Sequence, residues 1–246
     1  MKSSWVTVPR GFLLQFVAAT LFIVQLGLSL GDLPFLKLMQ QIVCNNHYGA
    51  KTDEPLPKED CLVSAVQQEL NHITMRILIS VTVGGALVSF PLGILADRIG
   101  RVPVPTMCVF SLYMSQVYAM CVCWQWIAMP LKAIWGLGAV LLLGGGRSVV
   151  EAMVFTIISD VVPGAKRTDW FQWVIAAVLS GQLLGPFISA TLLKPSTWTP
   201  LFLSLGLVSS GGFLVIFTPE TLPPVLSKDP VDFEATKPTP PTLQSL

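Results

Sequence analysis

Long stretches without a charged residue alternate along the chain with short clusters of charged ones. The first stretch, Gly11 to Gly31, contains no charge, and as a helix it would reach about 30 Å, the thickness of the hydrocarbon core of a bilayer. Similar apolar stretches recur up to residue 218. The pattern predicts an all-α membrane protein with six spans, at residues 11–31, 77–96, 104–123, 133–159, 170–193 and 200–218.

The segments outside these spans are polar. Residues 32–75 carry clustered charges around Pro55 and Pro57, which is the composition of a solvated loop. Residues 221–246 are rich in proline, threonine and charge, so we expect a disordered tail there. Lysine and arginine are more frequent on the side of residues 1–10 than on the opposite side. This bias predicts that both termini are cytoplasmic and that 32–75 is an outer loop.

Two cysteines, Cys44 and Cys61, fall in the expected outer loop. An oxidising environment there would permit a disulfide between them, although spacing alone does not decide whether the geometry allows one. The other three cysteines lie inside one apolar stretch, where we expect reduced packing residues.

The composition excludes several classes of protein. Hydrophobic residues make up 52% of the 246 residues and charged residues 12%, with a mean hydropathy of +0.67, which excludes an ordinary water-soluble globule. The net charge of +1 offers no basic field for nucleic acid. Both histidines are isolated, and no Lys-Ser or Lys-Thr pair follows Gly144 to Gly146. The sequence therefore predicts no metal site, no cofactor and no enzyme, and a lipid bilayer as the surrounding partner.

The turn after the second span carries a distinctive run of residues. It reads Gly93-Ile-Leu-Ala-Asp97-Arg98-Ile-Gly100-Arg101. One glycine would let two helices approach closely, the other would permit a tight turn, and one acid with two bases forms a charged cluster. Any cytoplasmic helix turn collects arginines, but this order resembles the loop between helices two and three of the major facilitator superfamily, Gly-x-Leu-Ala-Asp-Arg-x-Gly-Arg. The chain departs from that pattern at Val102, where a further base is usual.

Other residues support the same resemblance. The fifth span contains Gly181, Gly185 and Pro186 in a run that resembles the Gly-x-x-x-Gly-Pro motif of antiporter members. The alternative is a plain helix contact through small residues, with a kink at the proline. The run at 66–70 is similar to a fungal branch of the superfamily, and the whole resemblance covers residues 10–222.

The resemblance implies a fold and a function. Members normally consist of two six-helix bundles around a central cavity, each bundle built from two inverted three-helix repeats, and this chain corresponds to the N-terminal bundle alone. The implied function is secondary active transport of a small molecule by alternating access, with proton-coupled export indicated by the fifth-span motif. A homodimer or a second polypeptide would supply the missing half. The alternative is a truncated, non-transporting membrane protein or a regulatory subunit of a full-length transporter.

Ionisable residues inside the expected spans are the candidate functional groups. Arg147 lies near the middle of the fourth span, and Glu151 follows one turn later on the same face. A lone charge at that depth costs about 2.5–3.5 kcal/mol, so the two must face each other, water or a partner. The resemblance implies that they line the cavity, where Arg147 would attract an anionic or polar group and Glu151 would exchange a proton. Gln25 and Gln182 lie at similar depth and would complete a polar cluster, whereas the alternative is a structural ion pair.

The resemblance also implies a gate at the cytoplasmic face. Asp97, Arg101 and Asp160 lie there, and charge pairing among them would hold the outward-facing state until its rupture opens the inner mouth. The alternative is a solvated surface cluster with little net energy.

Overall fold

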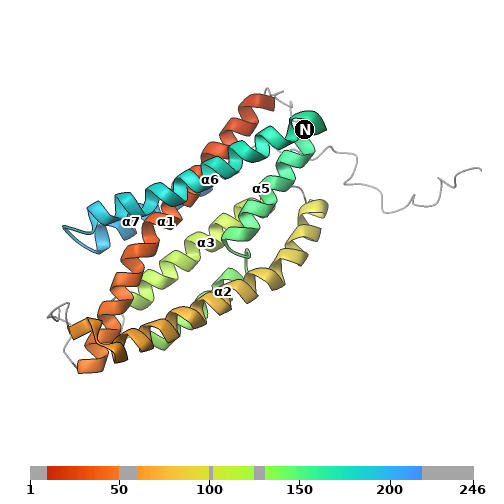
Figure 1. The fold of residues 1–246 in the computed structure, drawn as a ribbon. Coiled ribbons are helices and arrows are strands. Elements are labelled where there is room, and N and C mark those ends of the chain that lie inside the picture. The colour runs from red at the N-terminus through yellow and green to blue at the C-terminus, as the bar shows by residue number, and fades with distance from the viewer. Residues whose placement is uncertain (1–9, 50–59, 100–101, 125–130, 218–246) are drawn as a thin grey trace, which may run out of the picture.

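The computed structural model describes residues 10–49, 60–99, 102–124 and 131–217, and every regular element in those ranges is a helix (Figure 1). The α-helices are α1 (Arg10–Tyr48), α2 (Ser64–Ile99), α3 (Pro103–Cys123), α4 (Leu137–Leu141), α5 (Arg147–Val161), α6 (Gly164–Leu192) and α7 (Trp198–Ile216). Two 3₁₀ helices precede α2 and α4, namely η1 (Asp60–Leu62) and η2 (Leu131–Gly136). The N-terminal segment up to residue 9 and the expected tail at 221–246 lie outside the described residues.

Five of the described helices, α1, α2, α3, α6 and α7, are long and apolar enough to cross a membrane. The most apolar window of each has a mean hydropathy between 1.4 and 2.1. They correspond to the first, second, third, fifth and sixth of the predicted spans, although α6 ends at Leu192 and α7 at Ile216, before the predicted ends at 193 and 218. The all-α architecture is therefore confirmed, although the fourth predicted span has a different form.

The predicted fourth span, 133–159, is not one helix. It contains the end of η2, then α4 and most of α5, with a break at three consecutive glycines. Gly145 and Gly146 adopt φ values of +79° and +85°, which residues with a side chain rarely adopt. Gly144 packs so closely on α3 that an added Cβ would lie 2.6 Å from the Cβ of Ser111. Charge patterning could not reveal this break, because glycines are as uncharged as the apolar residues around them.

The predicted outer loop is also largely helical. α1 continues to Tyr48 and α2 begins at Ser64, so 32–48 and 64–75 extend both helices beyond the expected spans. Buried positions recur there at helical spacing. They include Leu38, Met39 and Val43 of α1 and Val66 and Leu70 of α2. The polar residues of this segment thus mark the exposed faces of amphipathic helices rather than the end of helical structure.

A disulfide joins the C-terminal part of α1 to η1. Cys44 and Cys61 are both buried, and their Cα atoms are 5.3 Å apart. They lie in an apolar cluster formed by the C-terminal ends of α1 and α3, the N-terminal ends of α2 and α7, and η2. The fold therefore contains the bond that the spacing of the cysteines left undecided.

α1 is the central helix of the bundle. It packs most extensively on α6 and α7 and also contacts α2, α3 and α5 (Figure 1). Its most apolar window is 61% buried, against 17% for α2 and 28% for α6 and α7. Polar side chains on α1 must therefore find their partners inside the bundle, and they define the candidate site.

Candidate functional site

Two polar contacts join α1 to α5. Nε2 of Gln25 donates a hydrogen bond to Oε1 of Glu151 over 2.5 Å. The Arg147 guanidinium lies 3.4 Å from Oδ2 of Asp32. Gln25 and Asp32 are separated by seven positions on α1, and Arg147 and Glu151 by four on α5, so each pair shares one helix face. Arg147 and Glu151 thus each have a partner on α1 rather than one another.

The two contacts differ in their exposure. Gln25 is 1% exposed and Glu151 is half-buried, so this contact is shielded from solvent. The side chains of Arg147 and Asp32 are 34% and 63% exposed. A shielded hydrogen bond is strengthened by the low local dielectric, whereas an exposed ion pair is screened and exchanges its partners readily.

The glycine break determines where Arg147 lies. Gly146 precedes α5 in a conformation with positive φ, and Arg147 is the first residue of the helix. The sequence placed Arg147 inside a continuous span, but it follows a turn and contacts Asp32 in the C-terminal half of α1. Its partner, Asp32, falls in the segment that the sequence predicted to be a loop. The signal was available, because Asp32 lies two helical turns after Gln25 on the same face.

The fifth-span glycines pack directly against the α1 backbone. A Cβ at Gly181 would lie 3.0 Å from the carbonyl oxygen of Phe22, and a Cβ at Gly185 would lie 2.6 Å from the Cβ of Ser29. This is the close helix contact that was the alternative to an antiporter motif. Pro186 lies inside α6, which continues to Leu192. Gln182 is half-buried, and its side chain makes no hydrogen bond within the described part of the chain.

The candidate gate residues lie at one end of the bundle. Asp97 and Arg98 are exposed at the end of α2, and Asp160 is exposed near the end of α5. In Figure 1 these helix ends lie at the same end of the molecule as the start of α1. Gly100 and Arg101 lie outside the described residues. Among the described residues, nothing lies within 4 Å of the position that a Cβ at Gly93 would take, so the close helix approach expected there is not seen in this part of the chain.

Arg167 of α6 caps the end of α5, a role that the sequence did not reveal. Its Nη2 donates hydrogen bonds to the carbonyl oxygens of Ser159 over 2.8 Å and Val162 over 3.5 Å. These carbonyls have no partner further along their own helix, and a cation also complements the helix dipole there. Arg167 therefore fixes the α5–α6 turn next to Asp160.

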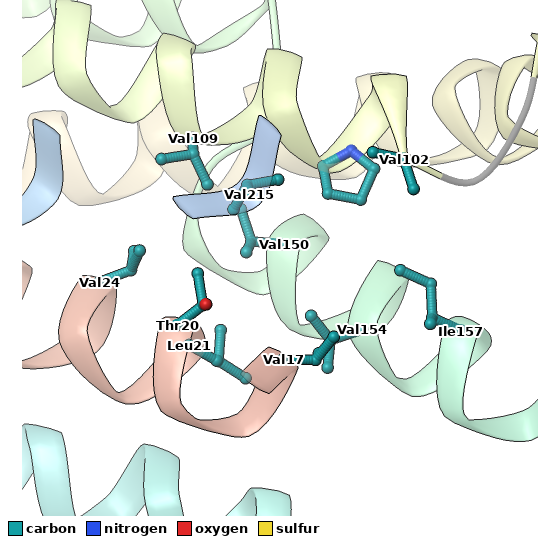
Figure 2. A pocket seen from close by; sticks show the side chains of 11 residues that line it. Val17, Thr20, Leu21, Val24, Val102, Val109, Val150, Val154, Ile157 and Val215 are labelled. Carbon is teal, nitrogen blue, oxygen red and sulfur yellow. The ribbon is translucent and has the colours of Figure 1, made fainter. Parts of the chain in front are cut away.

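The cavity beside α1 and α5 in Figure 2 is too small for a substrate. Its volume is about 30 Å³, close to the volume of one water molecule. Almost all of its lining is aliphatic, and Thr20 of α1 supplies the one hydroxyl drawn there. Valines of α1 and α5 face each other across it, which makes it part of the apolar core (Figure 2). A substrate would have to approach the polar contacts of Gln25 and Asp32 from another side of α1.

Five helices of this length and apolarity define an integral, multi-pass membrane protein. Within the described ranges, no three His, Cys, Asp or Glu side chains gather in a way that could hold a metal ion. Residues 12–244 match the sequence profile of the Major Facilitator Superfamily. The chain belongs to this family of membrane transporters, whose members act on small molecules.

Named relatives come from fungi. The chain is 30% identical over 217 residues to the MFS efflux pump atnC of Emericella nidulans, a match that covers 85% of this chain and 42% of the relative. It is 31% identical over 170 residues to the efflux pump ustT of Aspergillus flavus, covering 69% of this chain and 32% of the relative. The chain thus spans less than half the length of these relatives.

A solved structure shares the fold. The human organic anion transporter MFSD10 (TETRAN) superposes with a TM-score of 0.60 at 21% sequence identity. The superposition covers 88% of this chain and 49% of that chain. At this level of identity the likeness concerns the fold alone.

Proposed function

We propose that this chain forms one half of a secondary transporter that exports a small molecule by alternating access. The proposal rests on two polar contacts between α1 and α5. Gln25 donates a hydrogen bond to Glu151, and Asp32 pairs with Arg147. Ionisable side chains inside a membrane bundle are costly and mark substrate or proton pathways. The fungal relatives named as efflux pumps support the direction of transport.

Arg147 is proposed to bind an anionic or polar group of the substrate. Its guanidinium is partly exposed and is held by a single oxygen of Asp32 at 3.4 Å. This weak contact can be exchanged for a bidentate contact with a carboxylate or sulfonate of the substrate. Arg147 would then attract an anion without the cost of breaking a shielded ion pair.

Glu151 is proposed to exchange a proton during the cycle. When it is ionised, it accepts the hydrogen bond from Nε2 of Gln25. Oε1 of Gln25 is buried and has no partner in the described part of the chain, so it can accept a hydrogen bond from a protonated Glu151. Gln25 can therefore serve both protonation states, as a proton-coupling carboxyl group requires.

A second bundle is proposed to cover the open faces of α2 and α6. Exposed large apolar side chains occur on both helices. They include Leu78, Leu87 and Phe90 of α2 and Trp173, Leu183 and Phe187 of α6. A second copy or another polypeptide would pack there, with Gln182 of α6 close to the joint cavity. A non-transporting chain that docks on a full-length relative through these same apolar faces is the second candidate.

The exposed charges at the ends of α2 and α5 are proposed to act as the cytoplasmic gate, with both termini on that side. Asp97, Arg98 and Asp160 would pair in the outward-facing state and separate in the inward-facing state. Exposed ion pairs are weak, so these contacts can break and form again in every transport cycle.

The test is proton-driven uptake into liposomes that contain the purified full chain. Benzenesulfonate is a suitable probe, because it is permanently ionised and does not cross the bilayer as a neutral acid. Uptake should follow an imposed pH gradient, and Glu151→Gln should abolish the response to the gradient. Glu69→Gln, at an exposed position of α2, is the matched control and should behave as the unmodified chain. A strictly monomeric chain in detergent that also shows no uptake would leave only the non-transporting alternative.

A further inference from the structure

A groove lies between α1 and α6, on a different face of α1 from the cavity in Figure 2. These two helices make the most extensive helix pairing of the bundle (Figure 1). The groove has a volume of about 670 Å³, and the N-terminal parts of α1 and α6 supply its lining. Ligand sites commonly have volumes of about 300–1,000 Å³, so the groove can hold a small organic molecule.

Small and aromatic side chains shape the groove. The small ones are four alanines, Ala18, Ala19, Ala176 and Ala177. The large ones are three aromatic residues, Phe22, Trp170 and Trp173. Trp173 is 70% exposed, so its ring faces open space rather than the core. Such walls suit a flat aromatic ring, which stacks on other rings or meets their edges.

The groove also contains accessible hydrogen-bond donors. Gln15 is exposed, and its amide makes no hydrogen bond within the described part of the chain. The indole N–H groups of Trp170 and Trp173 are also without a protein acceptor there. The Ser180 hydroxyl already donates to the carbonyl oxygen of Ala176 over 2.6 Å. The open N–H donors therefore require a ligand that brings an acceptor oxygen.

Charge limits the ligand further. Among the described residues, the lining contains no ionisable side chain. A charged ligand would lose its hydration in the groove without meeting an opposite charge, and that loss is costly. The groove therefore favours a neutral ligand, unlike Arg147, which we propose binds an anionic or polar group.

Neither a lipid chain nor an apolar helix offers the required acceptor. Gln15, Trp170 and Trp173 lie within the first and fifth predicted spans. The hydrocarbon core of a bilayer has no hydrogen-bonding groups, and the carbonyls in the middle of a helix are already bonded to its own N–H groups. A small molecule with an acceptor oxygen can fill the groove and satisfy the donors together.

We propose that this groove binds a flat, neutral aromatic compound that carries a carbonyl oxygen. The ring packs over the alanines against Trp173, and the oxygen accepts a hydrogen bond from the Gln15 amide. The groove lies close to Gln25, because a Cβ at Gly181, next to Ser180, would be 3.2 Å from the Cβ of Gln25. The site goes beyond the proposed transport function, since a chain that transports nothing would still bind the compound.

The test is equilibrium dialysis of coumarin against the purified full chain, with octahydrocoumarin as the matched probe and detergent in both chambers. Both probes are neutral lactones with the same heavy atoms, but only coumarin is aromatic and flat. The unmodified chain should bind coumarin about fivefold more tightly, as expected for an aromatic pair. Trp173→Leu should abolish this preference, and Trp173→Phe should retain most of it. Phe202→Leu, at an exposed position of α7 outside the groove, is the matched control and should leave both affinities unchanged.

Gln15→Leu tests the hydrogen bond separately. Both probes carry the lactone carbonyl, so this change should weaken both about threefold or more and leave the preference for coumarin intact. Equal affinities of the unmodified chain for the two probes, unchanged affinities in Gln15→Leu, or no binding of coumarin would overturn the proposal. A second copy or a lipid that fills the groove would give the last of these results. Because no step depends on uptake, this outcome is independent of the liposome test of Glu151.

Discussion

Gly185 of α6 lies so close to Ser29 of α1 that a Cβ on the glycine would be 2.6 Å from the Cβ of the serine. No real pair of side chains approaches that closely, so either the helices or the serine would have to move. The contact lies within the most extensive helix pairing of the bundle, that of α1 with α6. The contact therefore fixes the position of α1 against α6. Gln25 and Asp32 lie on α1, so their positions depend on it.

Gly185→Ala is expected to destabilise the protein although alanine favours helices. Overpacking costs about 1–3 kcal/mol, whereas the gain in helix propensity is about 1 kcal/mol at most. The matched control is Gly206→Ala on α7, where no described residue lies within 4 Å of the added Cβ, and it should be neutral or stabilising. Thermal unfolding in detergent measures both. Equal effects of the two substitutions would show that the close packing is unimportant.

Gly146→Ala tests the break that replaces the predicted fourth span. Gly146 has a φ of +85° and open space around its missing Cβ, so any cost comes from the backbone alone. We expect a loss of about 1–3 kcal/mol in the free energy of unfolding. Gly164→Ala, at the start of α6, also meets nothing within 4 Å and has no positive φ, so it should cost far less. Similar losses at both sites would contradict a strained turn before Arg147.

The break illustrates what the sequence could and could not predict. Charge-free stretches correctly located the five long helices, because a charged side chain is costly at any position inside the bilayer. The glycines at 144–146 interrupt a helix through backbone conformation and packing on Ser111, neither of which alters hydropathy. The same limit hid the helical extension of α1 to Tyr48, since polarity reports exposure rather than helix ends.

The candidate site was predicted in part, because ionisable and amide side chains are easily recognised in an apolar stretch. Arg147, Glu151 and Gln25 stand out as polar groups in apolar surroundings, and the structure joins Glu151 to Gln25. Asp32 escaped notice because it follows the last apolar residue of the first span. Its spacing to Gln25 places both residues on one face of α1, but its partner Arg147 lies 115 positions later in the chain. A pairing across that distance follows from tertiary packing.

The Asp32–Arg147 pair is expected to contribute little to stability. Its side chains are 63% and 34% exposed, and exposed ion pairs contribute about 0–1 kcal/mol. A double-mutant cycle of Asp32→Ala and Arg147→Ala, read by thermal unfolding in detergent, should give a coupling energy in that range. Added salt should reduce the coupling further, because screening acts on exposed charges. A coupling of several kcal/mol would mean that the pair is shielded, and the proposed exchange of Asp32 for a substrate anion would then fail.

The Cys44–Cys61 disulfide is expected to stabilise the packing of the C-terminal end of α1 on the N-terminal end of α2. The bond closes a segment with a sequence separation of 17, and a loop of about 15 residues corresponds to a stabilisation of about 3 kcal/mol in the chain-entropy description. Cys44→Ala/Cys61→Ala should therefore unfold at a lower temperature than the oxidised protein. The remaining described cysteines, Cys108, Cys121 and Cys123, are free thiols, so a reductant should lower the unfolding temperature of the unmodified chain and leave the double variant unchanged. A reductant that shifts both proteins equally would show that the effect does not arise from this bond.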